Sequence, residues 1–461
     1  MPIRLLASLL SLGLFHLAPC LTAEPVGWRT NGLGAYPQAT PPKTWAKDKH
    51  VVWCAKMPGW SNASPVLSGD KIFVCSEPAI LLCVNRKDGN LLWQKEVAYQ
   101  DLMTPEDKEK FATEQKQAEE LQKQLKPLER QLSDLKKKLA TDAATKEESQ
   151  KKIDALKPQV DEFKKKLSDL PLSAKYARPG AEPSNGYSSS TPVTDGQLVY
   201  SVCGLSLVAC HDAGGNRKWL TLLEKPPHNW GQSASPLLIG DKLIVQIADL
   251  VALNVKDGSE AWRAKVPWAW GSPIHAKIGG VDVAITPKGN IVRVSDGKVL
   301  AEKLCALEFN APILDQGVVY FIQNGGKAVK LPEQAADVLK PEVLWTTKPK
   351  ADRYYASPIL HAGLLYAITR ANLFSAIDAK TGEVVYEKQL DLGGGTAYPS
   401  LALAGNLLYV SSDSGTTLVL ELGREYKEVS KNVLESFRCS PVFEGKHMFI
   451  RTRSGLYCIG E

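Results

Sequence analysis

A short pattern recurs through most of the 461 residues and constrains the fold more than any other feature of the sequence. In each copy a proline, usually within Ser-Pro, precedes an apolar stretch and a turn that contains glycine. From the second copy onward the spacing averages about 41.5 residues. Each copy is typical of four short β-strands, and four strands per forty-odd residues form one blade of a β-propeller. The markers are Pro65, Pro192, Pro236, Pro273, Pro312, Pro358, Pro399 and Pro441.

The number of blades follows from how the first and last repeats meet. Pro441 lies 20 residues before the last residue, which is enough for three short strands but not for four. Residues 50–56 end like the last strand of other repeats and supply the fourth, so that pairing the two leaves no long unpaired edge. The sequence therefore predicts an all-β, eight-bladed β-propeller of four-stranded blades. Seven blades are the alternative if Ala311-Pro312, the most degenerate marker, does not begin a full blade.

The turn after the third strand of a repeat has a more specific signature. Residues 83–93, 252–262 and 376–386 align without gaps, and 210–219 is a copy that is one residue shorter. Asp or Asn stabilises such a turn, Gly supplies a positive φ, and an aromatic side chain four residues later packs between blades. These repeat residues are Gly89, Gly258, Gly382, Trp93, Trp219, Trp262 and Tyr386.

This spacing resembles the pyrroloquinoline-quinone (PQQ)-type β-propeller repeat, Ala-x-Asp-x-x-Thr-Gly-x-x-x-Trp. The lead-in at residues 28–34 (WRTNGLG) also resembles that of exported bacterial propellers of this group. The resemblance implies one of two functions. One branch consists of alcohol and sugar dehydrogenases that bind PQQ and calcium, and the other is a non-enzymatic, BamB-like branch that acts as a scaffold. The fold alone does not choose between them.

Residues 101–172 interrupt the repeats and differ from them in composition. Between 101 and 170 the chain has 16 basic and 16 acidic residues, so the segment is dense in charge but neutral. Apolar residues recur there at alternating intervals of three and four, in two runs separated by the polar stretch 141–148. This is the heptad pattern of two helices that pack along a seam. We predict an inserted α-helical coiled-coil hairpin between the first and second blades.

Residues 1–23 have the features of a signal peptide, with one charged residue, an apolar run and a small residue at the end. We favour a soluble, exported protein of the periplasm or cell envelope. A lipid anchor at Cys20 is the alternative, although Pro19 departs from a lipoprotein box. No later segment has the length and apolarity of a transmembrane helix. The predicted divisions are the signal (1–23), the lead-in, ring-closing strand and first blade (24–100), the hairpin (101–172) and the remaining blades (173–461).

The ionisable residues do not indicate a reactive site. The net charge of +6 is modest and evenly spread, which argues against a nucleic-acid partner. The sequence has no pair of adjacent cysteines of the kind that quinoprotein alcohol dehydrogenases carry over the quinone, and no recognisable metal-binding or catalytic motif of that family. We therefore assign no catalytic, cofactor-binding or metal-binding residue, and PQQ with calcium is the alternative. Four candidate acids lie in expected turns, where a structural role suffices: Asp195, Asp241, Asp257 and Asp378.

Eight cysteines follow the signal, and two interpretations of them are open. Cys83, Cys210 and Cys458 occupy the small position of the repeat, where other copies have alanine, which favours a role as small core residues. An exported location would also permit disulfides between neighbouring strands. The pairs in that interpretation are Cys75–Cys83, Cys203–Cys210 and Cys54–Cys458.

Aromatic residues stand shortly before the inner strand of several repeats. In a propeller this strand lines the central channel, so the loop before it opens onto one mouth of the channel. The residues are Trp60, Tyr187, Trp230, Trp270, Tyr355 and Phe437. Packing between blades accounts for most of them, but such a ring could also bind a peptide strand, a sugar or a flat cofactor. We predict that Trp60, Trp230, Trp270 and Tyr355 surround the mouth.

The sequence as a whole favours an exported, non-enzymatic propeller that binds protein or peptide partners in the cell envelope. The predicted hairpin is a second candidate surface for such partners. A PQQ- and calcium-dependent alcohol or sugar dehydrogenase and a carbohydrate-binding propeller are the alternatives.

Overall fold

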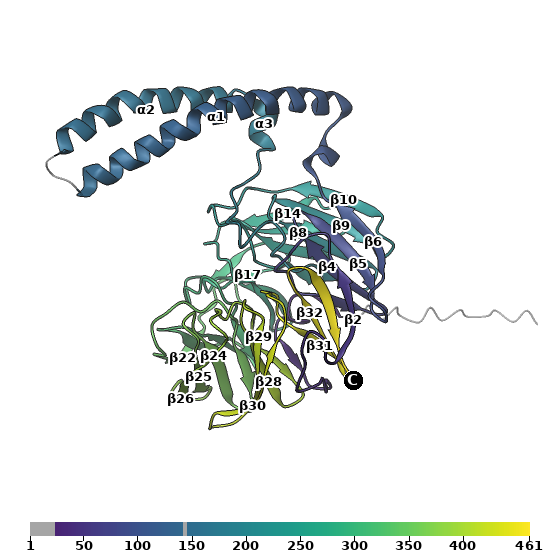
Figure 1. Cartoon of the computed structure of the whole chain (residues 1–461). Coiled ribbons are helices and arrows are strands. Elements are labelled where there is room, and N and C mark those ends of the chain that lie inside the picture. The colour runs from purple at the N-terminus through teal and green to yellow at the C-terminus, as the bar shows by residue number, and fades with distance from the viewer. Residues whose placement is uncertain (1–23, 142–144) are drawn as a thin grey trace, which may run out of the picture.

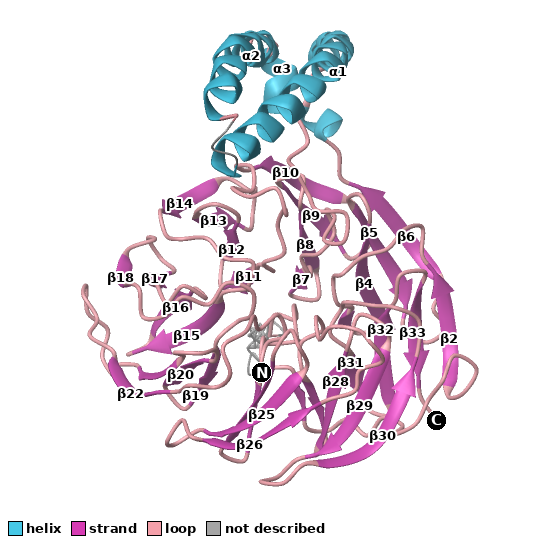
Figure 2. Ribbon diagram, turned by 60° about the vertical axis from the view of Figure 1, so that its left-hand side comes forward, coloured by secondary structure: helices cyan, strands magenta, loops and turns pink. Residues whose placement is uncertain are grey.

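The computed structural model of the protein describes residues 24–141 and 145–461, and the predicted signal with Cys20 lies outside them. The described chain forms eight antiparallel four-stranded sheets around a central axis, one of them extended by a short parallel strand (Figure 2). The prediction of an eight-bladed propeller is confirmed. The segment around Pro312 forms a complete blade, so the seven-blade alternative is wrong.

In each of the first four blades the strands follow one another from the inner strand outward. Blade 1 contains β3 (Val66–Ser68), β4 (Lys71–Ser76), β5 (Ile80–Asn85) and β6 (Leu91–Glu96). Blade 2 contains β7 (Val193–Thr194), β8 (Leu198–Cys203), β9 (Leu207–Asp212) and β10 (Arg217–Leu222). Blade 3 contains β11 (Leu237–Ile239), β12 (Lys242–Gln246), β13 (Leu250–Asn254) and β14 (Glu260–Ala264). Blade 4 contains β15 (Ile274–Ile278), β16 (Val281–Ile285), β17 (Ile291–Arg293) and β18 (Val299–Ala301).

The next three blades have the same order. Blade 5 contains β19 (Ile313–Asp315), β20 (Val318–Phe321), β21 (Lys327–Lys330) and β22 (Glu342–Thr346). Blade 6 contains β23 (Ile359–His361), β24 (Leu364–Ile368), β25 (Leu373–Asp378) and β26 (Val384–Gln389). Blade 7 contains β27 (Ala402–Ala404), β28 (Leu407–Ser411), β29 (Thr416–Glu421) and β30 (Lys427–Val433), and β1 (Ala35–Tyr36) adds to β27 in parallel.

Blade 8 is built from two distant parts of the chain, and it closes the ring. Its three inner strands are β31 (Val442–Glu444), β32 (His447–Arg451) and β33 (Gly455–Ile459). The outer strand is β2 (Val51–Lys56), which pairs antiparallel with β33 and places Trp53 opposite Cys458. Closure by an early strand removes the free edge that an open ring would expose.

A belt of hydrogen bonds joins neighbouring blades at the start of their inner strands. In each link, the backbone N–H of the residue two positions before the strand donates to the side-chain hydroxyl of the equivalent residue in the next blade, at 2.9–3.1 Å. Seven links connect the eight blades. The missing one would run from Ser272 to blade 5, where Ala311 has no hydroxyl. We call these hydroxyl-bearing residues the hydroxyl belt: Ser64, Thr191, Ser235, Ser272, Ser357, Ser400 and Ser440.

A second contact between blades joins the outer strand of one blade to a turn of the next. A tryptophan Nε1–H donates to a backbone carbonyl of that turn, and the indole ring covers the turn's glycine, which has a positive φ. A β-carbon on Gly89, Gly258 or Gly382 would lie 2.5–2.6 Å from the covering indole. The donors and acceptors are Trp53 and Arg86, Trp93 and Ala213, Trp219 and Val255, Trp262 and Val294, and Trp345 and Ala379. Tyr386 stands at the equivalent place in β26 and packs against the core between blades 6 and 7.

The insertion is helical, as the heptad pattern predicts. Helix α1 (Pro105–Thr141) and helix α2 (Lys146–Ser168) lie side by side and project beyond the rim near blade 2 (Figure 1). Leu125, Leu156 and Val160 are buried between them. The 3₁₀ helix η1 (Tyr99–Leu102) leads into the hairpin and the short helix α3 (Pro171–Lys175) leads out of it. Within residues 24–141 and 145–461, no helix is long and apolar enough to cross a membrane.

The cysteines at the small position of the repeat are core residues. Cys83 and Cys210 are fully buried, and Cys458 is almost so. Burial raises the pKa of the Cys83 thiol to about 12, so this thiol stays protonated at neutral pH. All eight cysteines between 24 and 461 carry free thiols. Cys75 faces Leu81 across the sheet rather than Cys83, and the alternative disulfides are not formed.

Completing the hydroxyl belt should stabilise the fold. In Ala311→Ser, the new hydroxyl would accept from the N–H of Ser272, and one net hydrogen bond contributes about 1 kcal/mol to the free energy of unfolding. Thermal and denaturant unfolding should show this gain, whereas Ala306→Ser, at an exposed position of the same connecting loop, should leave stability unchanged. Equal effects of the two substitutions would show that the belt does not contribute to stability.

The contact between indole and glycine can be tested within one blade. Gly258 and Gly240 both have a positive φ, but a β-carbon would touch Trp219 only at Gly258 and would meet nothing within 4 Å at Gly240. Both substitutions by alanine strain the backbone, and Gly258→Ala also overpacks the turn. We expect Gly258→Ala to lower the free energy of unfolding by at least about 1 kcal/mol more than Gly240→Ala. Equal losses would contradict a packing role for Trp219.

Candidate binding site at the channel mouth

A cavity of about 390 Å³ lies at the end of the central channel where the loops lead into the inner strands. Residues from all eight blades line it, together with two segments from outside the repeats. The volume is within the range of about 300–1,000 Å³ that is typical of pockets for small molecules. The cavity is therefore suited to a small ligand or to one end of a longer one.

One position in every blade contributes a side chain to the wall of this cavity. It stands two residues before the belt position, so in extended chain the two side chains point to the same side. Blades 1 to 3 supply polar residues, blades 4 to 7 supply aromatic residues, and blade 8 supplies an arginine. We call this set the mouth ring: Asn62, Ser189, Ser233, Trp270, Phe309, Tyr355, Tyr398 and Arg438.

The aromatic members form a continuous arc with Trp230 along one side of the cavity. We call Trp230, Trp270, Phe309, Tyr355 and Tyr398 the aromatic arc. Successive ring centroids are 5.7, 5.2, 5.0 and 4.6 Å apart, within the range of favourable aromatic pairs. The guanidinium of Arg438 lies 3.9 Å from the centroid of Tyr398 and ends the arc. Trp230 at the other end is 39% exposed and forms the rim.

The N-terminal lead-in closes the channel beyond the belt. Val26 forms a β-bridge with Thr194 of blade 2, and Arg29 donates from Nη2 to the carbonyls of Pro358 and Leu401 on blades 6 and 7. Trp28, between these two anchors, lines the cavity. Burial lowers the pKa of Arg29 to about 10, so the side chain remains charged at neutral pH. The lead-in thus crosses the channel from blade 2 to blades 6 and 7 and forms part of the cavity lining.

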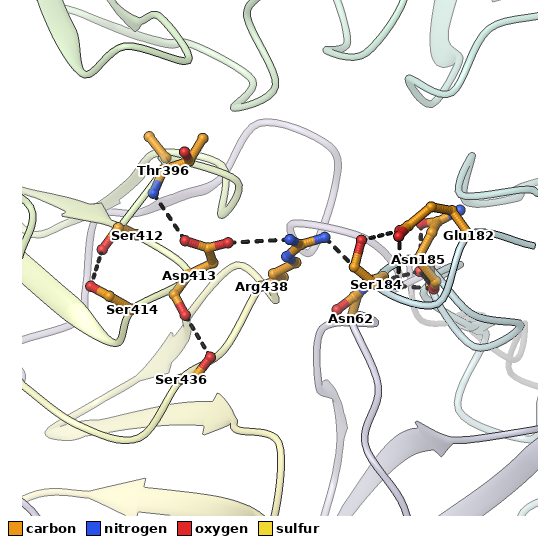
Figure 3. A network of polar contacts seen from close by, with 12 residues as sticks. Asn62, Glu182, Ser184, Asn185, Thr396, Ser412, Asp413, Ser414, Ser436 and Arg438 are labelled. Atoms are coloured by element: carbon orange, nitrogen blue, oxygen red, sulfur yellow. Dashed lines mark hydrogen bonds and ion pairs between the residues drawn. The ribbon is translucent and has the colours of Figure 1, made fainter. Parts of the chain in front are cut away.

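The loop that returns from the hairpin forms part of the polar wall (Figure 3). Arg438 donates from Nη1 to the carbonyl of Ser184 at 3.1 Å and from Nη2 to the carboxylate of Asp413 at 3.2 Å. Asn62 donates to the same Ser184 carbonyl at 3.0 Å. Hydrogen bonds from Ser184 to Glu182 lower the pKa of that carboxyl group. The charged groups at the mouth are therefore held by neighbours within the protein.

The structure brings only some of the predicted mouth residues to the cavity. Trp230, Trp270 and Tyr355 line it, whereas Trp60, Tyr187 and Phe437 do not. Trp60 lies under the guanidinium of Arg453, 5.1 Å from its ring centroid. The hydroxyl of Tyr187 donates to the Pro179 carbonyl, and its ring packs near the base of the hairpin.

Phe437 shows why the prediction was wrong at this position. Its side chain is 2% exposed and lies in the core between blades 7 and 8. The next residue, Arg438, has the register of the mouth ring and points into the cavity wall. A shift of one residue in extended chain moves a side chain to the opposite side.

Sequence reasoning missed most of the mouth ring although a signal was present. Counting two residues back from each belt position finds every member, including Phe309, Tyr398 and Arg438. Blade 7 obscures this count because Pro399 comes directly before the belt serine, Ser400. In every other blade the repeat proline comes directly after the belt position. Trp28, Glu182 and Asn185 come from segments outside the repeats, so no repeat pattern could predict them.

Comparison with known proteins places this architecture in a family. The sequence model described as "Outer membrane protein assembly factor BamB" matches residues 181–386 and 248–461, more than half of the chain. The chain belongs to the BamB family. The curated protein "Outer membrane protein assembly factor BamB" of Yersinia pestis is 20% identical over 246 residues, which are 50% of this chain and 61% of that protein. The chain thus matches less than two thirds of the length of this relative.

Solved structures share the BamB-family fold at low sequence identity. BamB from Moraxella catarrhalis superposes with a TM-score of 0.53 at 11% identity, covering 88% of this chain and 96% of that one. A quinohemoprotein alcohol dehydrogenase from Pseudomonas putida has a TM-score of 0.52 at 11% identity, covering 92% and 76%. Because both identities are low, these likenesses show the fold alone.

The donor set of the cavity does not fit a calcium-bound quinone of the kind that such dehydrogenases use. Calcium takes about six to eight oxygen ligands, usually including carboxylates. Among the described residues that line the cavity, Glu182 is the only carboxylate, and one of its oxygens already accepts from Ser184. In residues 24–141 and 145–461, no three His, Cys, Asp or Glu side chains form a group that could hold a metal ion.

Arg438 should fix the hairpin-side loop to the opposite wall of the cavity. In Arg438→Ala, the Ser184 carbonyl and Asp413 each lose a donor, so the segment 182–189 should open more often. Hydrogen–deuterium exchange should then show faster exchange of its backbone amides. Arg424→Ala, which removes a guanidinium that pairs with the Asp378 carboxylate at the same 3.2 Å but away from this segment, should leave these amides unchanged. Unaltered exchange in Arg438→Ala would contradict the anchoring role.

Proposed function

We propose that the protein is an exported, non-enzymatic scaffold of the cell envelope that binds protein partners. Membership of the BamB family supports this, since the family model and the Yersinia pestis relative are both described as outer membrane protein assembly factors. The helical hairpin and the rim of the channel mouth are the two surfaces that we propose for partners. Export is inferred from the signal-like residues 1–23.

The chemistry of the mouth is the observation that carries the non-enzymatic part of the proposal. A general base or acid needs a titratable group that is free to meet a substrate. Glu182 accepts hydrogen bonds from Ser184, and Arg438 pairs with Asp413. The exposed side chains that remain are aromatic, amide and hydroxyl groups, which bind ligands rather than react with them.

The base of the hairpin has the rigidity that a binding arm requires. The Tyr99 hydroxyl donates to the Leu205 carbonyl of blade 2 at 2.7 Å, and its ring lies 5.6 Å from that of Tyr176. Glu114 of α1 accepts from the N–H groups of Leu172 and Ser173 at 2.8 and 2.9 Å and so fixes the start of α3. These contacts, made by both the segment that enters the hairpin and the segment that leaves it, hold the hairpin against the propeller.

Site-specific photocrosslinking in the native cell envelope would test the scaffold proposal. A photoreactive amino acid replaces Lys151 on the exposed hairpin, Trp230 on the rim or, as a control, Val384 on outer strand β26. Val384 and Trp230 have nearly equal exposure, 38% and 39%. We expect discrete protein adducts at Lys151 or Trp230 and none at Val384. Adducts at no position, or at all three alike, would contradict a specific scaffold.

The enzymatic alternative has its own test on the same preparation. The purified full chain is incubated with PQQ and calcium and then assayed for dye-linked oxidation of alcohols and sugars. We expect no turnover above that of the free cofactor, because the cavity offers too few carboxylates for the metal. Turnover that depends on the protein would overturn the non-enzymatic proposal.

A further inference from the structure

We propose that the cavity at the channel mouth binds the terminal sugar ring of a neutral glycan, a ligand that the scaffold function does not require. The proposal stands on three features of the cavity: a circle of unused hydroxyl donors, an aromatic arc and a lining whose two charged residues, among those described, are of opposite sign. It is independent of the partners proposed for the hairpin.

The hydroxyl belt provides a circle of hydroxyl groups that are able to donate hydrogen bonds to a ligand. All seven belt residues line the cavity. Each hydroxyl oxygen accepts a backbone N–H from the neighbouring blade, and a hydroxyl group can also donate its own proton. Within residues 24–141 and 145–461, none of the seven donates to another group of the protein. The cavity therefore offers donors from most directions around the channel axis.

A sugar ring matches this circle better than a peptide strand does. Its hydroxyl and ring oxygens are distributed around its whole edge, so several can accept from the belt at once. A peptide backbone alternates donors and acceptors on two sides, and its N–H groups would need acceptors. Because the belt hydroxyl oxygens already accept backbone N–H groups of the protein, they serve a ligand as donors rather than as acceptors.

The aromatic arc supplies the second element of sugar recognition. The faces of a pyranose ring carry C–H bonds, which pack against aromatic side chains. In the arc, Trp270 stacks on Phe309 and Tyr355 stacks on Tyr398, so one face of each of these rings is covered by its neighbour and the rest of the ring is left for a ligand. Trp230, Trp270 and Tyr355 lie on one side of the cavity, and the polar residues of blades 1 to 3 lie on the other. This division fits a ligand with an apolar face and a polar edge.

Charge and depth restrict the ligand further. Glu182 and Arg438 are the charged residues that line the cavity among those described. Arg438 pairs with Asp413 and Glu182 accepts from Ser184, so the lining carries one acidic and one basic group and no excess of either charge. Trp28 and the anchored Arg29 close the far side of the belt. The lead-in thus crosses the channel at the far side of the cavity, which favours binding of the end of a chain over its middle.

Titration of the full chain with neutral oligosaccharides would test the proposal. Maltotriose, cellotriose and N-acetylglucosamine trimer are each added while tryptophan fluorescence and calorimetric heat are measured. We expect saturable binding of at least one of them. Trp270→Ala and Tyr355→Ala should each weaken that binding roughly 5-fold, since an aromatic contact contributes about 1 kcal/mol. Tyr426→Ala, beside Lys388 and next to outer strand β30, lies outside the cavity and should bind as the parent protein does.

Two variants of one belt residue distinguish the effect of its hydroxyl on ligand binding from its effect on the stability of the propeller. Ser235→Ala removes the hydroxyl, and Ser235→Thr retains it, as Thr191 does in the neighbouring blade. We expect Ser235→Ala to weaken sugar binding by roughly 3- to 10-fold and Ser235→Thr to restore it. Thermal unfolding of each variant identifies any that fails to fold, and Tyr355→Ala remains informative if Ser235→Ala does not.

Two results would overturn the inference. One is the lack of saturable binding for all three oligosaccharides, and the other is binding that Trp270→Ala and Tyr355→Ala leave unchanged. If a short aromatic peptide binds and Trp270→Ala weakens its binding, while the sugars do not bind, the ligand of the cavity is a peptide and not a glycan. Photocrosslinking through the hairpin would be unaffected by any of these outcomes, so failure here is distinguishable from failure of the scaffold proposal.

Discussion

The hydrogen bonds of the hydroxyl belt hold the inner strands of neighbouring blades together around the axis of the propeller. Inner strands of two to five residues meet near the axis, where side chains from eight blades converge. A backbone N–H left without an acceptor in this buried place would destabilise the fold by about 1–3 kcal/mol. Placing a small hydroxyl residue two positions before each strand satisfies the N–H of the preceding blade. The contact also fixes the distance between blades, and the indole–glycine contacts do the same at the outer edge.

The sequence predicts the number of blades better than it predicts the individual contacts between them. The recurrence of Ser-Pro and of the glycine turn is enough to predict eight blades and their closure, because each blade is an independent copy of one unit. Blade 5 forms despite Ala311, since its core residues, such as Val319 and Phe321, are still those of a blade. Trp345 covers Gly382 although its repeat departs from the motif, so the packing site tolerates more variation than the sequence pattern suggests.

The candidate site was harder to predict because it depends on register and on distant segments. Phe437 and Arg438 are neighbours in sequence, yet one is in a core and the other is in the mouth ring. Aromatic content alone cannot distinguish them, whereas the alternation of side chains in extended chain can. Trp28 and Glu182 reach the cavity only because the lead-in and the loop after the hairpin cross the ring, and these long-range contacts leave no local pattern. The polar half of the mouth was missed because Asn62, Ser189 and Ser233 are ordinary loop residues.

The hairpin and the cavity share one connecting segment, and its anchors determine whether the two surfaces can influence each other. Between them, Glu77 of blade 1 accepts from the N–H groups of Tyr187 and Ser188, both at 2.7 Å, and from the Ser188 hydroxyl at 2.6 Å. Burial raises the pKa of Glu77, while the three donors favour its charged form. The Tyr99 contact with blade 2 fixes the other side of the hairpin base. A partner that moves the arm would have to break both anchors before it could displace Ser184 or Asn185 at the cavity. These two anchors therefore separate motions of the hairpin from the wall of the cavity.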